Sequence, residues 1–279
     1  MAHKTMVDGT SYEITGGKTL VDGTAYSIKS GKTLVDGTAY GIEFGGWPDD
    51  LDTGLEFLSE NSFTLASVNH AWDGTMEYCN SQEGWKIWNG GKIYSGETER
   101  GQCIYIRGTG NTTITNGNLY NRFVLGGAGI FCDGNIENIL DYATVAAGKH
   151  PTMAELCFFS LFKGETELKS APSLPATTLA EHCYDSMFYG CTELTSLPSL
   201  PATTLAKYCY RYMFQNCTKI KLSTDKTGAY TTAYRIPFSG TGTDANYTMD
   251  NMFYGTGGTF AGTPTINTTY YLDSSNTIV

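Results

Sequence analysis

The chain has 279 residues and a formal net charge of −10, and only 16% of its residues are charged. This acidic balance disfavours a nucleic-acid partner, because binding to the phosphate backbone needs clustered Lys and Arg side chains. Apolar runs of the roughly 18 residues that span a membrane are absent, and no apolar secretory segment follows the Met-Ala-His-Lys start. We therefore expect neither membrane insertion nor export through a signal peptide.

Three tandem copies of a 14-residue unit open the chain, and each places Asp-Gly between short β-prone runs. Asp-Gly is a preferred pair for a two-residue hairpin turn, so we predict three β-hairpins within residues 1–46. A segment this short with few apolar groups is near the lower limit for independent folding, which favours an assembly or anchoring role. The copies are KTMVDGTSYEITGG (4–17), KTLVDGTAYSIKSG (18–31) and KTLVDGTAYGIEFG (32–45). They resemble amino-terminal segments of phage minor virion proteins, and this resemblance implies docking onto other virion proteins.

Residues 47–141 carry short apolar runs, such as Cys103–Ile106 and Phe123–Leu125, separated by Gly and Asn clusters. This spacing predicts an antiparallel β-sandwich rather than βαβ units. All four tryptophans lie here, at Trp47, Trp72, Trp85 and Trp88. Two interpretations stay open for them. They pack in the core or between domains, or they form a platform on which sugar rings stack.

A second repeat follows, with LKSAPSLPATTLAEHCYDSMFYGCTE (168–193) directly succeeded by LTSLPSLPATTLAKYCYRYMFQNCTK (194–219). Weaker copies surround 155–164 and 252–255, with an insertion near 224–246. A period of 26 residues is typical of a solenoid, whose units cover their apolar faces by stacking. We predict a solenoid of about four rungs over 142–279, with a C-terminal cap.

Leu179, Cys183, Met187 and Cys191 recur every four residues within one repeat, which predicts an apolar helical face, and Gly190 is placed to end that helix. The preceding prolines predict an extended segment. The repeat resembles the BspA-like class of leucine-rich repeats, found in surface adhesins of gut bacteria and in proteins of their phages. The resemblance spans about 50–220, since the segment before the repeats is similar to a domain that accompanies them. It implies an α/β solenoid, in a chain that is otherwise mostly β.

Positions that differ between the two copies are predicted to be solvent-exposed, because core positions must fit the stack. They include Glu181/Lys207, His182/Tyr208, Asp185/Arg211, Ser186/Tyr212 and Tyr189/Gln215. Tyr and Arg are enriched at binding hot spots. We therefore take Tyr208, Arg211, Tyr212, His182 and Asp185 as candidate binding residues.

Eight cysteines are present, four of them at matching repeat positions. We predict buried, reduced thiols, since synthesis in the cytoplasm keeps them reduced. Stacking of Cys183 on Cys209 leaves a late disulfide open as an alternative. Zinc is not expected, because C-x2-C and paired-His spacings are absent.

The sequence predicts no catalytic residues, no metal ligands and no cofactor. Asp49, Asp50 and Asp52 offer carboxylates for calcium, but a solvated linker is the other interpretation of that cluster. The four histidines stand outside any nucleophile or metal motif.

These observations predict a phage virion-associated structural protein, part of a tail or head fibre, that attaches to a host surface glycan or protein. A homo-oligomer, with a trimer as one option, follows by analogy with fibres. A bacterial surface adhesin and a purely architectural virion decoration protein are the alternatives. A glycan-active enzyme is the least favoured class, because no converging carboxylate pair is evident.

Overall fold

The computed structural model describes residues 47–69, 72–117, 121–237 and 247–279 in full, and the backbone of six strands before them. Two compact units divide the chain, Met1–Pro48 and Asp49–Val279. Each unit is described here by itself.

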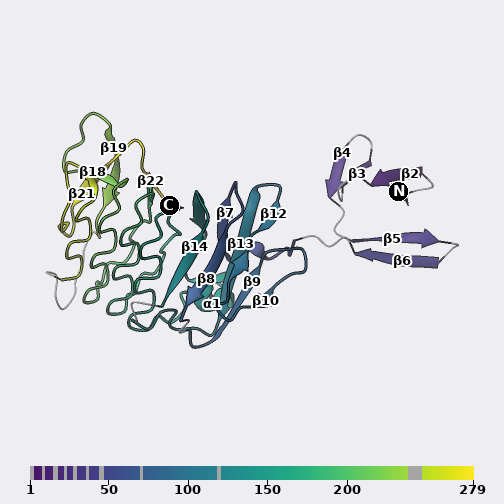
Figure 1. Cartoon of the computed structure of the whole chain (residues 1–279), viewed down its shortest axis with the longest axis horizontal. Helices are drawn as coiled ribbons and strands as arrows, with labels where there is room; N and C mark the ends of the chain where they lie inside the picture. Colours follow the sequence, from purple (N-terminus) through teal and green to yellow (C-terminus); the bar gives the residue numbers. More distant parts are fainter. Residues whose placement is uncertain are drawn as a thin grey trace. The chain divides into compact units, whose positions relative to one another are not determined.

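The first unit consists of antiparallel strand pairs, one for each N-terminal repeat (Figure 1). In the first pair Val7 is opposite Thr10, so two residues separate the strands. The Asp-Gly pairs themselves, and the side chains of all six strands, lie outside the described residues. The strands are β1 (His3–Val7), β2 (Thr10–Ile14), β3 (Lys18–Val21), β4 (Thr24–Ser27), β5 (Ser30–Val35) and β6 (Thr38–Glu43).

The second unit begins with a 3-10 turn, η1 (Leu51–Thr53), and two β-sheets. The larger sheet has the order β10-β9-β13-β7-β15-β16, with β12 also on β13, and the smaller has the order β11-β8-β14. Side chains from both sheets meet in the core, where the rings of Phe57 and Phe123 are 6.3 Å apart. The strands are β7 (Leu55–Ser59), β8 (Thr64–Val68), β9 (Thr75–Cys79), β10 (Lys86–Ile87), β11 (Ile93–Tyr94), β12 (Gly96–Thr98), β13 (Gly101–Thr109), β14 (Arg122–Gly126), β15 (Ile130–Asp133) and β16 (Leu168–Ser170).

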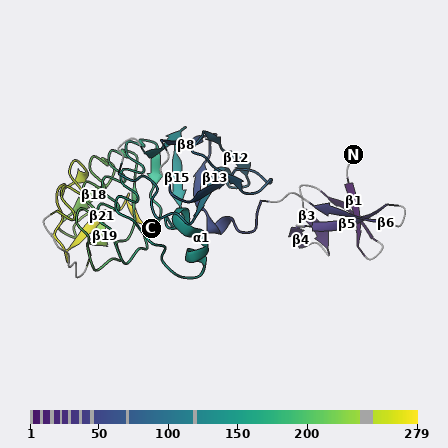
Figure 2. The same ribbon diagram turned by 90° about the horizontal axis from the view of Figure 1, so that it is seen from below.

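One α-helix, α1 (Asn138–Ala146), occurs among the described residues, and it packs against β13 (Figure 2). Its first turn buries Ile139 and Leu140 completely. Asp141 leaves the helical conformation, with φ of −153°, and its carboxylate accepts a hydrogen bond from the Gly110 amide at 2.8 Å.

The repeats contain no α-helix within their described residues, so the predicted helix over Leu179–Cys191 is wrong. Each repeat instead forms a ribbon of consecutive tight turns. The φ angle is positive at every fourth residue of the ribbon, for example +56° at His182, +58° at Ser186 and +74° at Gly190. The turn ribbons comprise residues 155–164, 181–190, 207–216 and 247–255.

Hydrogen bonding explains why the ribbons form. Alternate amides close turns, as when Cys183 donates to the Ala180 carbonyl at 3.3 Å. The intervening amides bind the next repeat, as when Tyr184 donates to the Cys209 carbonyl at 3.0 Å. A left-handed conformation is unfavourable for most residues. In the ribbons it lets every second amide donate a hydrogen bond to the next repeat, whereas the amides of an α-helix bond within the helix and would not link the repeats.

The apolar residues that recur every four positions belong to a chain of turns. In each turn two consecutive side chains point into the core. Cys183, Tyr184, Met187 and Phe188 are all completely buried. Equivalent rings stack in parallel from repeat to repeat, in the columns Phe158–Tyr184–Tyr210 and Phe162–Phe188–Phe214–Phe253, with centroids 5.5 to 5.9 Å apart.

Short strands line the other side of the repeats: β17 (Ser196–Leu197), β18 (Lys221–Ser223), β19 (Tyr230–Arg235), β20 (Gly257–Gly258), β21 (Thr269–Asp273) and β22 (Thr277–Ile278). The C-terminal strands join two repeats here, because β22 pairs with β17 and β21 pairs with β18. Buried Asn276 links the repeats, donating to the Thr195 and Lys219 carbonyls at 3.0 Å each and accepting from the Lys221 amide at 2.9 Å.

Both ends of the ribbon stack are covered by other chain segments. At one end the Ile114 amide donates to the Cys157 carbonyl at 2.9 Å, and at the other the Phe253 amide donates to the Gly262 carbonyl at 3.0 Å. Covered edges leave fewer unpaired backbone groups to recruit another strand.

All eight cysteines are buried, as predicted, and none is paired in the structure. Burial raises the pKa of the Cys103, Cys209 and Cys217 thiols to about 12. Among the described residues, no helix has the length and apolar character needed to cross a membrane.

Candidate functional site

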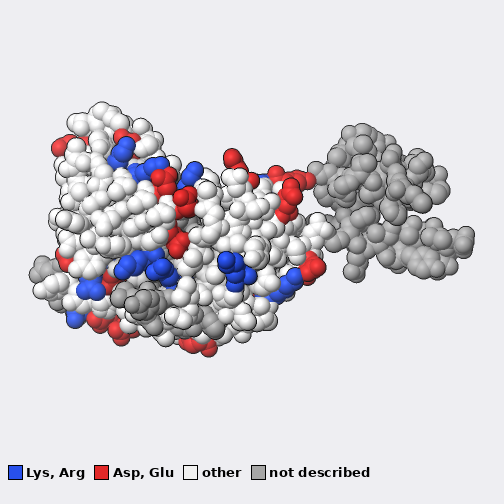
Figure 3. Space-filling view, viewed as in Figure 1, with Lys and Arg blue, Asp and Glu red and all other residues white. Residues whose placement is uncertain are grey.

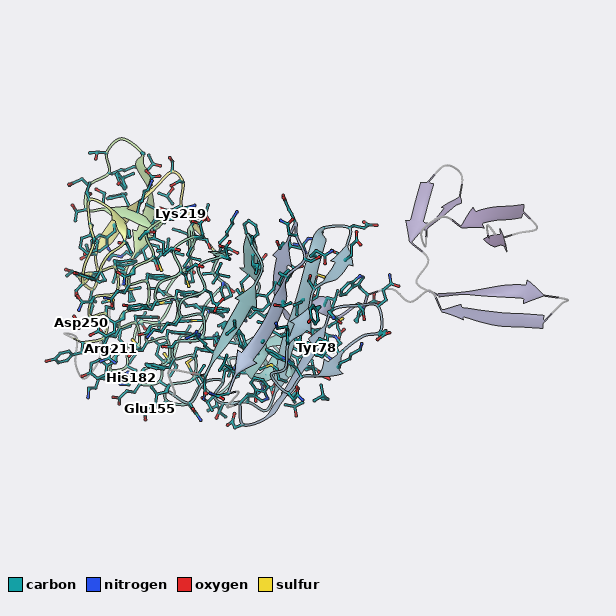
Figure 4. The ribbon with its side chains drawn as sticks, viewed as in Figure 1. Tyr78, Glu155, His182, Arg211, Lys219 and Asp250 are labelled. Atoms are coloured by element: carbon teal, nitrogen blue, oxygen red, sulfur yellow. The ribbon has the colours of Figure 1, made fainter. Side chains whose placement is uncertain are left out.

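The candidate binding residues lie along one edge of the turn ribbons. Figure 4 shows Glu155, His182, Arg211 and Asp250 following one another along that edge, one from each ribbon. We define the stacked face as His182, Asp185, Tyr208, Arg211, Tyr212 and Tyr247.

A row of rings runs along this face because equivalent positions stack. The His182 and Tyr208 rings are 4.6 Å apart with an interplanar angle of 28°, and the Tyr208 and Tyr247 rings are 5.7 Å apart. Tyr247 is 47% exposed. The positive φ angles of His182 and Tyr208 set both side chains in the same orientation, so the row is a consequence of the turn geometry.

Asp185 lies beneath the row with its side chain completely buried. Its Oδ2 atom faces His182 Nδ1 at 2.8 Å and accepts a hydrogen bond from Arg211 Nε at 2.9 Å. Arg211 Nη2 is 2.7 Å from the same oxygen in an ion pair. Its Oδ1 atom accepts a hydrogen bond from the Ser186 hydroxyl at 2.8 Å. A buried carboxylate requires such partners, and here they fix the rotamers of both basic side chains.

Arg211 is stacked as well as paired. Its guanidinium carbon is 4.3 Å from the centroid of the Tyr208 ring and 5.0 Å from that of Tyr212. The side chain keeps 26% of its area exposed. Hydrogen bonds and stacking thus hold this cation in place beside the rings.

Three of the differences between the repeats form ion pairs across the stack. Each pairs an acid in the first copy with a base 26 residues later: Glu181 with Lys207 at 3.8 Å, Asp185 with Arg211 at 2.7 Å and Glu193 with Lys219 at 2.5 Å. Identical copies would place like charges in contact. Part of the sequence variation therefore serves stacking.

The predicted exposure is wrong for two positions. Asp185 is completely buried, and Ser186 is only 6% exposed. Their variation between the copies predicted exposure to solvent. The stack can bury both side chains because His182 and Arg211 pair with the Asp185 carboxylate, which also accepts a hydrogen bond from the Ser186 hydroxyl. The other eight residues of the five predicted pairs are intermediate in exposure. The structure brings all five candidate residues together, and their role in binding stays a prediction.

The polar groups of the face do not form a serine–histidine–aspartate relay. His182 and Asp185 are paired, but the Ser186 hydroxyl donates to Asp185 and not to the imidazole, so a serine nucleophile is not activated. Among the described residues no group of His, Cys, Asp and Glu is arranged to hold a metal ion.

A second polar cluster, missed by sequence reasoning, surrounds Arg107. Its guanidinium lies 4.0 Å from the Trp85 ring centroid and 4.1 Å from that of Tyr142, and it pairs with Asp50 at 2.5 Å and with Glu77 at 2.9 Å. Asp50 also accepts from Trp85 Nε1 at 2.9 Å. Asp50 thus anchors this cluster. The available signal was Arg107 itself, a charged residue that directly follows the apolar run Cys103–Ile106 in β13.

The tryptophans mainly pack. Trp88 is only 3% exposed, and its ring lies 5.3 Å from that of the partly buried Trp72. Trp85 is engaged by Arg107. These contacts favour the packing interpretation for all three.

Charged side chains on the face seen in Figure 3 occur in small groups of mixed sign between larger uncharged areas. That pattern provides no continuous basic surface on this face of the second unit.

Comparison of the chain with family models, with curated proteins and with solved structures gave no match.

Proposed function

We propose that the chain is a virion-associated structural protein of a phage, part of a tail or head fibre, whose second unit attaches to a host cell surface. The stacked face carries the proposal, because it combines a row of partly exposed aromatic rings with a guanidinium held in place by a buried carboxylate. Aromatic and Arg side chains in preordered settings dominate binding energy at interfaces.

We further infer that residues 47–141 act as a β-sandwich and residues 142–279 as a leucine-rich-repeat-like solenoid of about four rungs. The hydrogen bonds between repeats and the shared columns of rings support this. Residues 1–46 would anchor the protein to other virion proteins. Several copies on one particle would convert weak contacts into strong attachment by raising the effective concentration.

Two labelled fragments, 1–48 and 49–279, test this assignment on gut bacterial cells and on phage particles lacking the protein. We expect 49–279 to coat cells and 1–48 to attach to particles. Docking of 1–48 without any binding of 49–279 to cells would instead identify a decoration protein. Absence of the native protein from purified particles would contradict a virion role and favour a bacterial adhesin.

Variants of the stacked face test where binding occurs. Tyr208→Ala and Tyr247→Ala are expected to weaken cell binding at least tenfold, or about 1.4 kcal/mol. Tyr254→Ala is the matched control, since Tyr254 is 56% exposed in the same ribbon as Tyr247 but outside the face. Equal losses of cell binding in all three variants would contradict the assignment of the face. Turnover of envelope polysaccharide by the purified protein would contradict a purely binding role.

A further inference from the structure

A separate hollow of about 340 Å³ lies on the outer side of the larger sheet. It is located at the neighbouring strands β7, β15 and β16, beside the first repeats. This volume is within the range of small-ligand sites, about 300–1,000 Å³. Three segments line it: the turn after β7, the turn between β14 and β15, and the first repeats. The lining residues are Ser59, Glu60, Asn61, Ala128, Gly129, Phe131, Glu167, Lys169 and Glu193.

Phe131 provides an apolar surface in this hollow. The alternation of β15 turns Cys132 into the core, where it is 1% exposed, and leaves Phe131 44% exposed. Lys169 Nζ is 5.8 Å from the centroid of the Phe131 ring. The negatively polarised face of an aromatic ring attracts positively polarised groups, including the C–H bonds of a sugar ring.

Hydrogen-bonding groups surround that ring, and acceptors outnumber charged donors. Glu60, Glu167 and Glu193 contribute carboxylates, whereas Lys169 is the one cation among the lining residues. Carboxylates accept hydrogen bonds from hydroxyl groups, and the Lys169 and Asn61 side chains donate them. Glu193 is balanced by Lys219, but Glu60 and Glu167 still outnumber Lys169, and this excess of negative charge disfavours anionic ligands.

The walls of the hollow are held in place before any ligand binds. The Ser59 hydroxyl donates to the Ala128 carbonyl at 2.9 Å and so joins the two turns, and it accepts from the Asn61 amide at 3.2 Å. On the repeat side, Glu193 is paired with Lys219 at 2.5 Å. Lys219 lies on the opposite edge of the repeats from His182 and Arg211 (Figure 4), so this hollow is distinct from the stacked face.

We propose that this hollow is a binding site for a neutral oligosaccharide, with one sugar ring stacked on Phe131 and its hydroxyl groups bonded to the surrounding carboxylates, Asn61 and Lys169. An apolar ring amid mixed acceptors and donors matches a sugar, which presents C–H faces and hydroxyl edges together. The site stands independently of the stacked face and of a virion role.

The test is titration of the full chain with neutral oligosaccharides of glucose, mannose, galactose and N-acetylglucosamine, and with oligogalacturonate as an anionic counterpart. Binding is followed by ligand-observed NMR. We expect at least one neutral sugar to bind and oligogalacturonate to bind at least tenfold more weakly. Phe131→Ala should weaken sugar binding about tenfold, and Ala128→Trp, which fills the hollow from an exposed position, should abolish it.

Tyr94→Ala is the matched control, because Tyr94 is an aromatic residue that is 67% exposed and does not line the hollow. It should bind the sugar as the parent chain does, as should Tyr208→Ala on the stacked face. The proposal is overturned if none of the neutral sugars binds, if Phe131→Ala binds unchanged, or if Tyr94→Ala loses binding to the same degree. Loss of cell attachment in Tyr208→Ala with sugar binding retained would separate the two sites.

Discussion

Tyr184 buries its hydroxyl group without a hydrogen-bond partner in the ring column of the repeats. The equivalent residue in the preceding ribbon is Phe158, so an unsubstituted ring fits the column. Tyr184→Phe should therefore raise the free energy of unfolding by about 1 kcal/mol, because it removes an unsatisfied polar atom. Chemical denaturation measures this directly.

Tyr234→Phe is the matched comparison. The Tyr234 hydroxyl is also buried, but it donates a hydrogen bond to the Pro198 carbonyl at 2.9 Å. Removing this hydroxyl should therefore lower the free energy of unfolding by about 1 kcal/mol. Changes of the same sign in both variants would show that the hydroxyl groups are not what decides the outcome.

Glu165 makes stability depend on pH. Burial raises the pKa of this carboxyl from 4.5 to about 7, although its hydrogen bond from the Leu125 amide and the charge of Arg122 act in the opposite direction. Between these two values the folded chain binds more protons than the unfolded chain, so stability falls as the pH rises through this window.

We expect the ionisation of Glu165 to lower the free energy of unfolding by on the order of 3 kcal/mol between pH 4.5 and pH 7. Glu165→Gln does not titrate and should flatten that part of the stability curve, measured by urea denaturation at stepped pH. An unchanged slope in the variant would assign the pH dependence to other groups.

At the scale of the element, the turn ribbon depends on pairing between neighbouring repeats. Asp185→Asn removes the charge that holds Arg211 and His182, and we expect it to lower the free energy of unfolding by about 3 kcal/mol. Glu193→Gln removes the corresponding partner of Lys219 in a partly exposed pair and should lower the free energy of unfolding by less than about 1 kcal/mol. Denaturation midpoints of the two variants decide the comparison, and similar losses would mean that burial of the pair is unimportant.

The ribbon also shows why an apolar period of four was misleading. In an α-helix this spacing places residues on one face, but residues with positive φ at every fourth position produce the same spacing in a chain of turns. Most of these positions are not glycine, so sequence alone had no marker for them. His182, Ser186 and Tyr212 adopt this conformation, in which their amides donate to carbonyls of the next repeat.

At the scale of the molecule, residues 49–279 share one continuous core that includes both sheets and the repeats. The strand β15 pairs with β16, so the larger sheet itself extends into the repeats. We expect fragment 49–279 to unfold in one cooperative transition at the melting temperature of the same unit in the full chain. Calorimetry checks this, and two separate transitions would indicate independent domains.

The buried thiols give a second measurement on the whole molecule. Burial raises the pKa of the Cys132, Cys157, Cys183 and Cys191 thiols well above the usual value, which suppresses the reactive thiolate. The native chain should resist a thiol reagent, and the unfolded chain should react at all eight cysteines. A reducing agent should leave the melting temperature unchanged; a decrease would reveal the Cys183–Cys209 disulfide that was left open.

The sequence by itself determined where the repeats lie, their period, which of their residues are apolar and which five polar residues belong to one surface. Those features follow from copying, because equivalent residues of stacked units must meet. The tertiary structure decided that the repeats form turns, that Asp185 is buried and that Phe131 stands in a polar hollow. Each of these depends on hydrogen bonds or walls contributed by residues far away in the chain, and no local pattern encodes those.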